Sequence, residues 1–148
     1  MYSALSVAHY IIDYCNERGR GISNLKLQKL LYFLQAEFLV STPNRTPCFK
    51  DRIEAWDFGP VVPNVYHQYK VFGSSNIPAN VNDMLVPFYE EISFEDQMMI
   101  DAIVDDASAY SASQLVQITH NQAPWRNAYR RGWSNEISND AIYEYFRE

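Results

Sequence analysis

The sequence predicts a mainly α-helical protein, a single compact domain over residues 1–148 with helices at both ends and a proline-rich, partly extended middle segment. Apolar residues recur at helical spacing before residue 41 and after residue 92, and serines precede several of these stretches. Six of the seven prolines fall between residues 43 and 87. At 47% hydrophobic and 20% charged, the chain is too hydrophobic for a disordered protein and large enough to bury a core without disulfides or metal.

Two helices are expected in the first 40 residues. Residues 3–18 place apolar side chains on one helical face, and Gly19 ends that pattern. Ser23 is suited to accept from the exposed amides of a second helix over residues 24–40, whose broad apolar stripe indicates deep burial.

The middle segment is expected to be less regular. Residues 51–58 are predicted to be a short strand or an extended segment, and residues 64–72 a short helix that ends at Gly73. The next apolar residues follow no clean period and predict a packed loop or a small β ribbon: Ile77, Val81, Leu85, Val86 and Phe88.

Helical patterns return after residue 92. The start signals are N-cap serines and a first-turn proline, at Ser93, Ser111, Pro124 and Ser138. They predict helices over residues 93–110, 111–120 and 125–131, and a final helix from residue 138 onward.

Charge is distributed unevenly along the chain. Residues 1–74 hold 8 basic and 6 acidic side chains, whereas residues 75–148 hold 4 basic and 12 acidic ones. An acidic stretch over residues 83–106 would repel nucleic-acid phosphates, so direct nucleic-acid binding is not expected. A basic protein partner would be attracted instead. The alternative is that these carboxylates only solvate a helix face.

The sequence indicates a cytoplasmic protein without membrane contact. The first charged residue is Asp13, so the N-terminus lacks the basic region of a secretory signal. The longest uncharged stretch, residues 107–125, carries too many polar side chains to span a bilayer. Cys15 and Cys48 form neither a disulfide framework nor a metal knuckle and are expected to be buried or idle thiols.

No local pattern predicts a catalytic residue, a metal site or a cofactor. The five glycines never take the spacing of a phosphate-binding loop, and the i, i+4 pair of His9 and Asp13 supplies only two zinc ligands. One alternative stays open, because catalytic partners meet in space rather than in sequence. It is a small phage-derived hydrolase or nucleic-acid enzyme with a site built from His67, His120, Asp57 and the two cysteines.

Two segments stand out as candidates for partner binding. Lys26, Lys29 and Phe33 share one face of the second helix, opposite its leucines, which fits either solvated lysines on a core helix or a partner-facing groove that includes Tyr32. In residues 54–63, Gly59 followed by Pro60 forces a rigid turn that aims the neighbouring aromatic side chains in fixed directions. Such a turn serves either packing or recognition.

Together these segments resemble the signature of the Panacea domain family, which includes SocA-like antitoxins and GepA-like phage-associated proteins. The residues that carry the resemblance are Lys26 to Phe33, Ile53-Glu54-Ala55-Trp56, Phe58-Gly59-Pro60-Val61-Val62-Pro63 and Val65-Tyr66. A looser likeness continues through residues 115–120, Pro124-Trp125 and residues 137–139, so it covers nearly the whole chain.

The resemblance implies an antitoxin of a bacterial or prophage toxin–antitoxin module, with no enzyme activity. Its implied partner is a cognate protein toxin encoded nearby, and an ATP-dependent protease is a second partner in one mode of action in the family. The candidate partner-binding residues are Lys26, Lys29, Tyr32, Trp56, Asp57, Gly59, Pro60 and Val61. We also expect the acidic stretch to contribute to the toxin-binding surface. A virion-associated interaction protein is the remaining alternative, and self-association as a homo-oligomer stays open.

Overall fold

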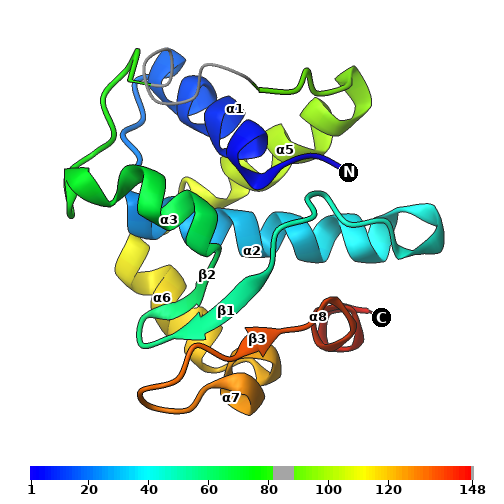
Figure 1. The fold of residues 1–148 in the computed structure, drawn as a ribbon. Coiled ribbons are helices and arrows are strands. Elements are labelled where there is room, and N and C mark those ends of the chain that lie inside the picture. Colours follow the sequence, from blue (N-terminus) through cyan, green and yellow to red (C-terminus); the bar gives the residue numbers. More distant parts are fainter. Residues whose placement is uncertain (82–88, 148) are drawn as a thin grey trace.

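The computed structural model describes residues 1–81 and 89–147 and confirms a mainly α-helical fold (Figure 1). The helices are α1 (Ala4–Glu17), α2 (Asn24–Ser41), α3 (Pro63–Tyr69), α5 (Phe94–Ala107), α6 (Ala112–His120), α7 (Ala123–Ala128) and α8 (Asn139–Phe146). Single 3₁₀ turns lie at Pro43–Arg45 and Lys70–Phe72, and three short strands form one sheet: β1 (Ile53–Trp56), β2 (Gly59–Val61) and β3 (Glu136–Ile137).

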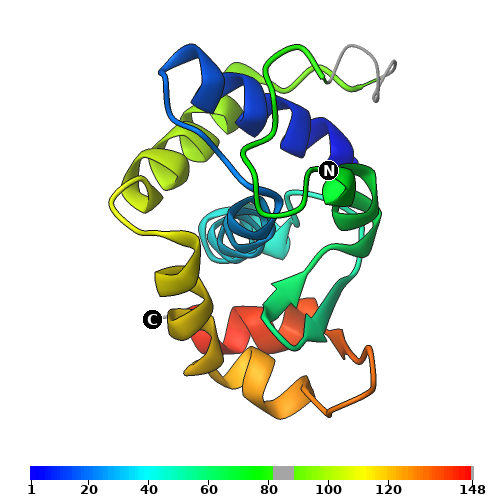
Figure 2. The ribbon, with the colours of Figure 1, turned by 90° about the vertical axis from the view of Figure 1, so that its left-hand side faces the viewer.

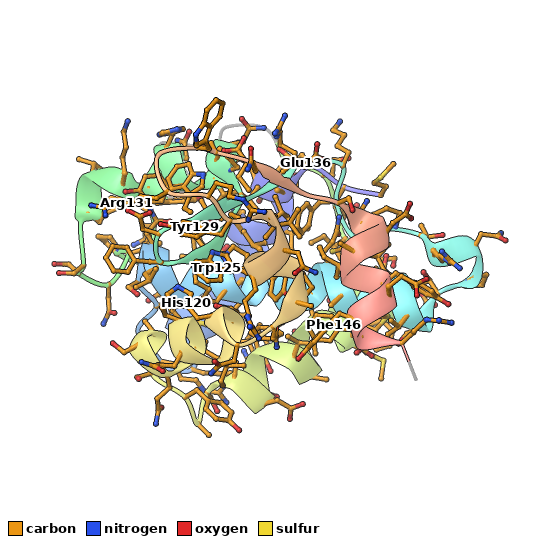
Figure 3. All side chains as sticks on the ribbon, turned by 90° about the horizontal axis from the view of Figure 1, so that it is seen from below. His120, Trp125, Tyr129, Arg131, Glu136 and Phe146 are labelled. Carbon is orange, nitrogen blue, oxygen red and sulfur yellow. The ribbon has the colours of Figure 1, made fainter. Side chains whose placement is uncertain are left out.

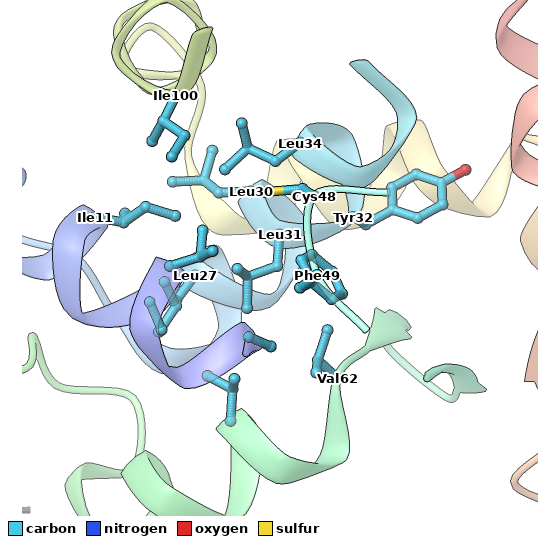
Figure 4. Packing of buried hydrophobic residues seen from close by; sticks show 14 of the residues in the cluster. Ile11, Leu27, Leu30, Leu31, Tyr32, Leu34, Cys48, Phe49, Val62 and Ile100 are labelled. Carbon is cyan, nitrogen blue, oxygen red and sulfur yellow. The ribbon is translucent and has the colours of Figure 1, made fainter. Parts of the chain in front are cut away.

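Helix α2 is the centre of the molecule. It contacts α1, α3, α5, α6, α8 and β2, and in Figure 2 it is seen close to end-on with the other elements around it. Its leucines are buried on several sides, as Figure 4 illustrates for Leu27, Leu30, Leu31 and Leu34. A helix buried all round belongs to the core rather than to the surface.

The serine caps predicted from the sequence are all present. Each cap oxygen accepts from the backbone amide three residues later, at 3.1–3.3 Å, for Ser23, Ser93, Ser111 and Ser138. Two helices end earlier than predicted. α5 stops at Ala107, where the following Ser108 hydroxyl donates back to the Asp105 carbonyl, and α7 stops at Ala128 because Tyr129 is extended.

The sheet has the order β2–β1–β3, with both pairs antiparallel. The predicted extended segment forms β1, and a tight turn over Asp57 and Phe58 leads into β2, with Trp56 opposite Gly59. The two-residue strand β3 was not predicted; it pairs Ile137 with Ile53.

The expected ribbon or packed loop after residue 76 is a packed loop where the structure describes it. The Ile77 amide donates to the Ile22 carbonyl at 2.8 Å, and the Ile77 side chain is buried. Leu85, Val86 and Phe88 lie outside the described residues.

Both cysteines are buried free thiols, as predicted. Burial raises the pKa of Cys15 and of Cys48, which keeps both thiols protonated and unreactive. Within residues 1–81 and 89–147, no helix combines the length and the hydropathy that a membrane span requires.

Candidate functional site

Helix α2 carries five buried polar side chains, and each of them bonds to backbone or side chain outside the helix. We call this set the polar row; it consists of Asn24, Gln28, Lys29, Tyr32 and Gln35. A buried polar group that lacks a partner costs stability, so these bonds determine which segments must pack against α2.

The N-terminal part of the polar row holds the N-cap of α3 and a carbonyl within that helix. The Asn24 amide donates to the Tyr66 carbonyl at 3.1 Å, and the Gln28 amide donates to Asn24 at 2.9 Å. The Gln28 carbonyl oxygen in turn accepts from the Val62 amide at 2.9 Å. The residues that follow the β hairpin are therefore attached to α2 by hydrogen bonds to the side-chain amides of Asn24 and Gln28.

The C-terminal part of the polar row holds two further irregular segments. The Gln35 side-chain oxygen accepts from the backbone amides of Cys48 and Phe49, at 2.9 and 3.2 Å. The Tyr32 hydroxyl donates to Gln122, the N-cap of α7, at 2.7 Å. The tyrosine therefore links α2 to the start of α7.

Lys29 is fully buried and touches the hairpin directly. Its ammonium nitrogen donates to the Pro60 carbonyl at 2.9 Å, and no carboxylate among the described residues pairs with it. Burial lowers the pKa of Lys29 to about 7. The interpretation of a solvated lysine is therefore wrong at this position.

Gly59 makes the close approach of Lys29 possible. Its φ of +107° is a conformation that favours glycine, and an added Cβ would lie 2.8 Å from both Lys29 Cε and Thr119 Oγ1. The turn before it is thus held between α2 and α6, with no space for a side chain.

An aromatic stack also binds the same turn. The ring of Trp125 stacks between His120, at 4.1 Å, and Tyr129, at 4.5 Å between centroids (Figure 3). Trp125 Nε1 donates to the Trp56 carbonyl at 2.8 Å, and His120 Nε2 bonds to the Asp57 carbonyl at 3.0 Å. Because a carbonyl only accepts, this contact places the His120 proton on Nε2.

The third member of the stack binds the Asp57 side chain. The Tyr129 hydroxyl donates to Asp57 Oδ1, and the carboxylate raises the pKa of Tyr129. The stack therefore fixes residues 56 and 57 by three hydrogen bonds, so the turn is formed before any partner arrives.

The outer face of the hairpin borders a groove of about 330 Å³, which we call the hairpin groove. Its floor includes Trp56 and Tyr66, whose rings meet edge to face at 4.9 Å. Phe58 and Trp133 flank it and are 66% and 71% exposed. Large exposed aromatics on a rigid support are typical anchors of protein–protein interfaces.

The candidate residues from the sequence fall into three locations. Trp56, Asp57 and Val61 line the hairpin groove. Four others are buried: Gly59 and Pro60 belong to the hairpin, Lys29 bonds to it, and Tyr32 bonds to Gln122 at the start of α7. Lys26 lies apart from both groups, where its ammonium donates to the Tyr110 carbonyl at 2.7 Å.

The sequence analysis missed Trp133 and the aromatic stack. His120, Trp125 and Tyr129 lie on both sides of the break between α6 and α7, so no single helical period connects them. Trp133 lies in the turn before β3, a strand of two residues that leaves almost no pattern in the sequence.

The residues of the alternative catalytic site are only partly brought together. The ring of His120 reaches Asp57, but it binds the backbone carbonyl and not the carboxylate. The His67 ring packs 6.1 Å from that of Trp56, and the buried cysteines lie elsewhere. Over residues 1–81 and 89–147, no three His, Cys, Asp or Glu side chains group as metal ligands.

The acidic stretch forms a separate surface from the hairpin. Three of its carboxylates accept from tyrosine hydroxyls at 2.6–2.9 Å, in the pairs Tyr2 with Asp96, Tyr10 with Asp101 and Tyr14 with Asp105. We call these pairs the Tyr–Asp ladder. Both Figures 1 and 2 place α2 between α5 and the hairpin. Asp83 lies outside the described residues.

Comparison with known proteins places this arrangement in a family. Residues 27–126 match the model described as antitoxin SocA-like, Panacea domain. The chain belongs to this family of SocA-like antitoxins. Antitoxin SocA of Caulobacter vibrioides (strain NA1000 / CB15N) is 36% identical over 129 residues, which cover 82% of this chain and 68% of that protein. No solved structure matches the chain.

The family match covers most of the site. It begins within α2 and ends in α7, and so includes Gln28, Lys29, the hairpin, His120 and Trp125. Trp133 follows the matched region. Lys29 and Gly59 thus lie within the matched residues, whereas Trp133, one flank of the hairpin groove, lies outside them.

Proposed function

We propose that this SocA-like chain is an antitoxin that neutralises a cognate protein toxin by direct, non-catalytic binding. The observation that carries the proposal is the family membership, together with the 36% identity to antitoxin SocA over most of the chain. The toxin is the product of a neighbouring reading frame, and both proteins act in the cytoplasm.

The toxin contacts the hairpin groove. Support comes from the two most prominent aromatics at its edge, Phe58 and Trp133, which offer contact area on a turn that is already ordered. A preformed turn loses little conformational entropy on binding, so more of the contact energy goes into affinity. Among the candidate residues, Trp56 and Asp57 contact the toxin, whereas the buried Val61, Lys29, Gly59 and Pro60 hold the hairpin in shape. Tyr32 acts only indirectly, through its bond to Gln122 at the start of α7.

A growth experiment tests the antitoxin role. Cells express the neighbouring small reading frame alone, with this chain, or with its Phe58→Ala/Trp133→Ala variant. We expect the frame alone to stop growth, the wild-type chain to restore growth and to co-purify with the product, and the double variant to fail at both. Toxicity that the wild-type chain does not relieve would contradict the antitoxin role.

A matched control isolates the hairpin groove. Phe94→Ala removes an aromatic of similar exposure, 71% against 66% for Phe58, from α5 on the other side of α2. This variant should restore growth as the wild type does. Rescue by the Phe58→Ala/Trp133→Ala variant would leave the antitoxin role intact but remove the hairpin groove from the toxin-binding surface.

The fate of the toxin separates two modes of neutralisation. If the antitoxin blocks its toxin, the toxin persists in a stable complex. If it delivers the toxin to an ATP-dependent protease, the toxin half-life shortens only when both the antitoxin and the protease are present. A pulse-chase comparison in cells with and without such a protease decides between them.

A further inference from the structure

A second groove lies between α5 and α6, apart from the hairpin groove. It has a volume of about 230 Å³, and its lining is almost wholly apolar. The apolar lining residues come from α2, from α5 and the turn after it, and from α6: Phe33, Ile103, Ala107, Tyr110, Leu115 and Ile118. We call it the α5–α6 groove.

Helix α6 separates the two grooves. Thr119 lies against Gly59, and His120 bonds to the hairpin turn, whereas Leu115 and Ile118 line the α5–α6 groove. The two grooves share no lining residue. A partner in one groove therefore leaves the other groove accessible.

Unpaired acidic groups lie along α5, and one of them is in the lining of the α5–α6 groove. Asp106 lines it, and Glu95 lies on the same stripe of α5, about three turns earlier. Both are exposed, and neither forms an ion pair or a side-chain hydrogen bond within the described part of the chain, unlike the carboxylates of the Tyr–Asp ladder. Two cations near this end of α5 already have partners: Lys26 donates to the Tyr110 carbonyl, and Arg20 pairs with Asp105.

We propose that the α5–α6 groove binds an amphipathic helix of a partner protein, with its apolar face in the groove and lysines or arginines along α5. An apolar trough between two helices matches the side-chain ridge of a third helix, as in helix-in-groove recognition. The free carboxylates of Glu95 and Asp106 select a cationic helix, because they attract opposite charge and repel acidic competitors. This inference does not depend on the toxin contact at the hairpin.

A synthetic peptide tests the proposal on the full chain. The probe is a fluorescently labelled helical peptide of leucine and lysine, with leucines at i, i+3, i+4 and i+7, and the matched control peptide carries glutamate in place of lysine. Fluorescence anisotropy measures binding, and amide chemical shifts locate it. We expect the lysine peptide to bind at least about tenfold more tightly than the glutamate peptide and to shift amides of α5 and α6. No binding, or shifts confined to the hairpin, would overturn the proposal.

Two variants and a control distinguish a loss of peptide binding from a folding defect. Glu95→Gln/Asp106→Asn changes only exposed groups and should weaken the lysine peptide about fivefold to tenfold, with a smaller dependence on salt. Ile118→Ser should weaken it by a similar factor without changing the salt dependence. The control Glu136→Gln/Asp140→Asn removes equal charge from β3 and α8 and should change affinity less than about twofold.

The control also defines what would contradict the inference. Equal weakening by the control and by Glu95→Gln/Asp106→Asn would mean that the peptide responds only to net charge. A dimer that Ile118→Ser dissociates, detected by light scattering, would assign the groove to a second copy of this chain. Either outcome overturns the proposal.

Discussion

The hairpin side and the α5 side of this molecule use polar side chains in opposite ways. On the hairpin side, the polar row of α2 is buried and holds irregular backbone, and the aromatic stack holds the turn from outside. On the α5 side, the ladder joins α5 to α1 and the N-terminal segment through partly exposed tyrosine–carboxylate pairs. The first arrangement fixes the backbone of the proposed toxin-binding surface, whereas the second fastens a helix.

This comparison changes the meaning of two sequence features. Lys29 of α2 is fully buried, which is rare for lysine, and it supports the hairpin through its bond to Pro60. Three carboxylates of the acidic stretch already accept hydrogen bonds within the molecule, and Asp105 is also paired with Arg20, so fewer of them are free to bond to a basic partner.

The largest expected effect is from Gly59→Ala. The added Cβ would meet Lys29 and Thr119 at 2.8 Å, and alanine disfavours a φ of +107°. Overpacking and backbone strain together should lower the free energy of unfolding by roughly 3 kcal/mol or more. Urea unfolding measures this loss.

Gly73→Ala is the matched control for Gly59→Ala. It also has a positive φ, +56°, but nothing lies within 4 Å of the added Cβ. It should lose about 1–3 kcal/mol, from backbone strain alone and without overpacking. Equal losses at the two glycines would show that the close contact with Lys29 does not matter.

The next effect concerns pH and Lys29. Because burial lowers the pKa of Lys29 to about 7 from 10.5, the unfolded state binds more protons above pH 7, and stability rises with pH through that window. Between pH 7 and 8.5 the wild type should gain about 1–2 kcal/mol in free energy of unfolding relative to Lys29→Met. Urea unfolding of both proteins at the two pH values measures the difference.

The rise in stability with pH ends where other buried groups begin to ionise in the unfolded state. The pKa values of Cys15, Cys48 and the buried tyrosines are raised, so these groups ionise first in the unfolded state and lower stability above about pH 9. Parallel pH curves for the wild type and Lys29→Met would mean that Lys29 titrates as in water.

A smaller effect is expected in the Tyr–Asp ladder. Tyr10→Phe removes the 2.6 Å hydrogen bond to Asp101 and should cost about 1 kcal/mol. Tyr145→Phe removes an exposed hydroxyl that forms no side-chain hydrogen bond in the described residues and should change stability by less than about 0.5 kcal/mol. Thermal unfolding of both variants tests whether the ladder fastens α5, and identical midpoints would argue against it.

The smallest effect on stability is expected from Phe58→Ala. The side chain is 66% exposed, so its loss should change the free energy of unfolding by less than about 0.5 kcal/mol. A large destabilisation, measured by urea unfolding, would mean that Phe58 packs the fold and does not serve a partner.

The sequence predicted most helices because their signals are local. Serine caps and apolar spacing gave the starts of α2, α5, α6 and α8, and each cap bond is present in the structure. The ends of α5 and α7 were predicted less accurately. These helices are followed by ordinary turn residues, Ser108 and Tyr129, and no glycine or proline marks where they stop.

The candidate site was only partly predictable. The Gly59–Pro60 turn was visible, because both residues restrict the backbone locally. The burial of Lys29 and the stack of His120, Trp125 and Tyr129 depend on contacts between distant segments, which no local pattern records. The family resemblance identified the motif but could not separate supporting residues from contacting ones.

The central claim is that the hairpin groove is the preformed surface that the toxin binds. Hydrogen exchange of the backbone amides, measured by mass spectrometry for the free chain and for its complex with the product of the neighbouring reading frame, tests it most directly. We predict that complex formation adds protection mainly over residues 54–62 and 129–135, while exchange in the free hairpin is already slow because its bonds are formed. Added protection confined to other segments, with none over the hairpin, would contradict the claim.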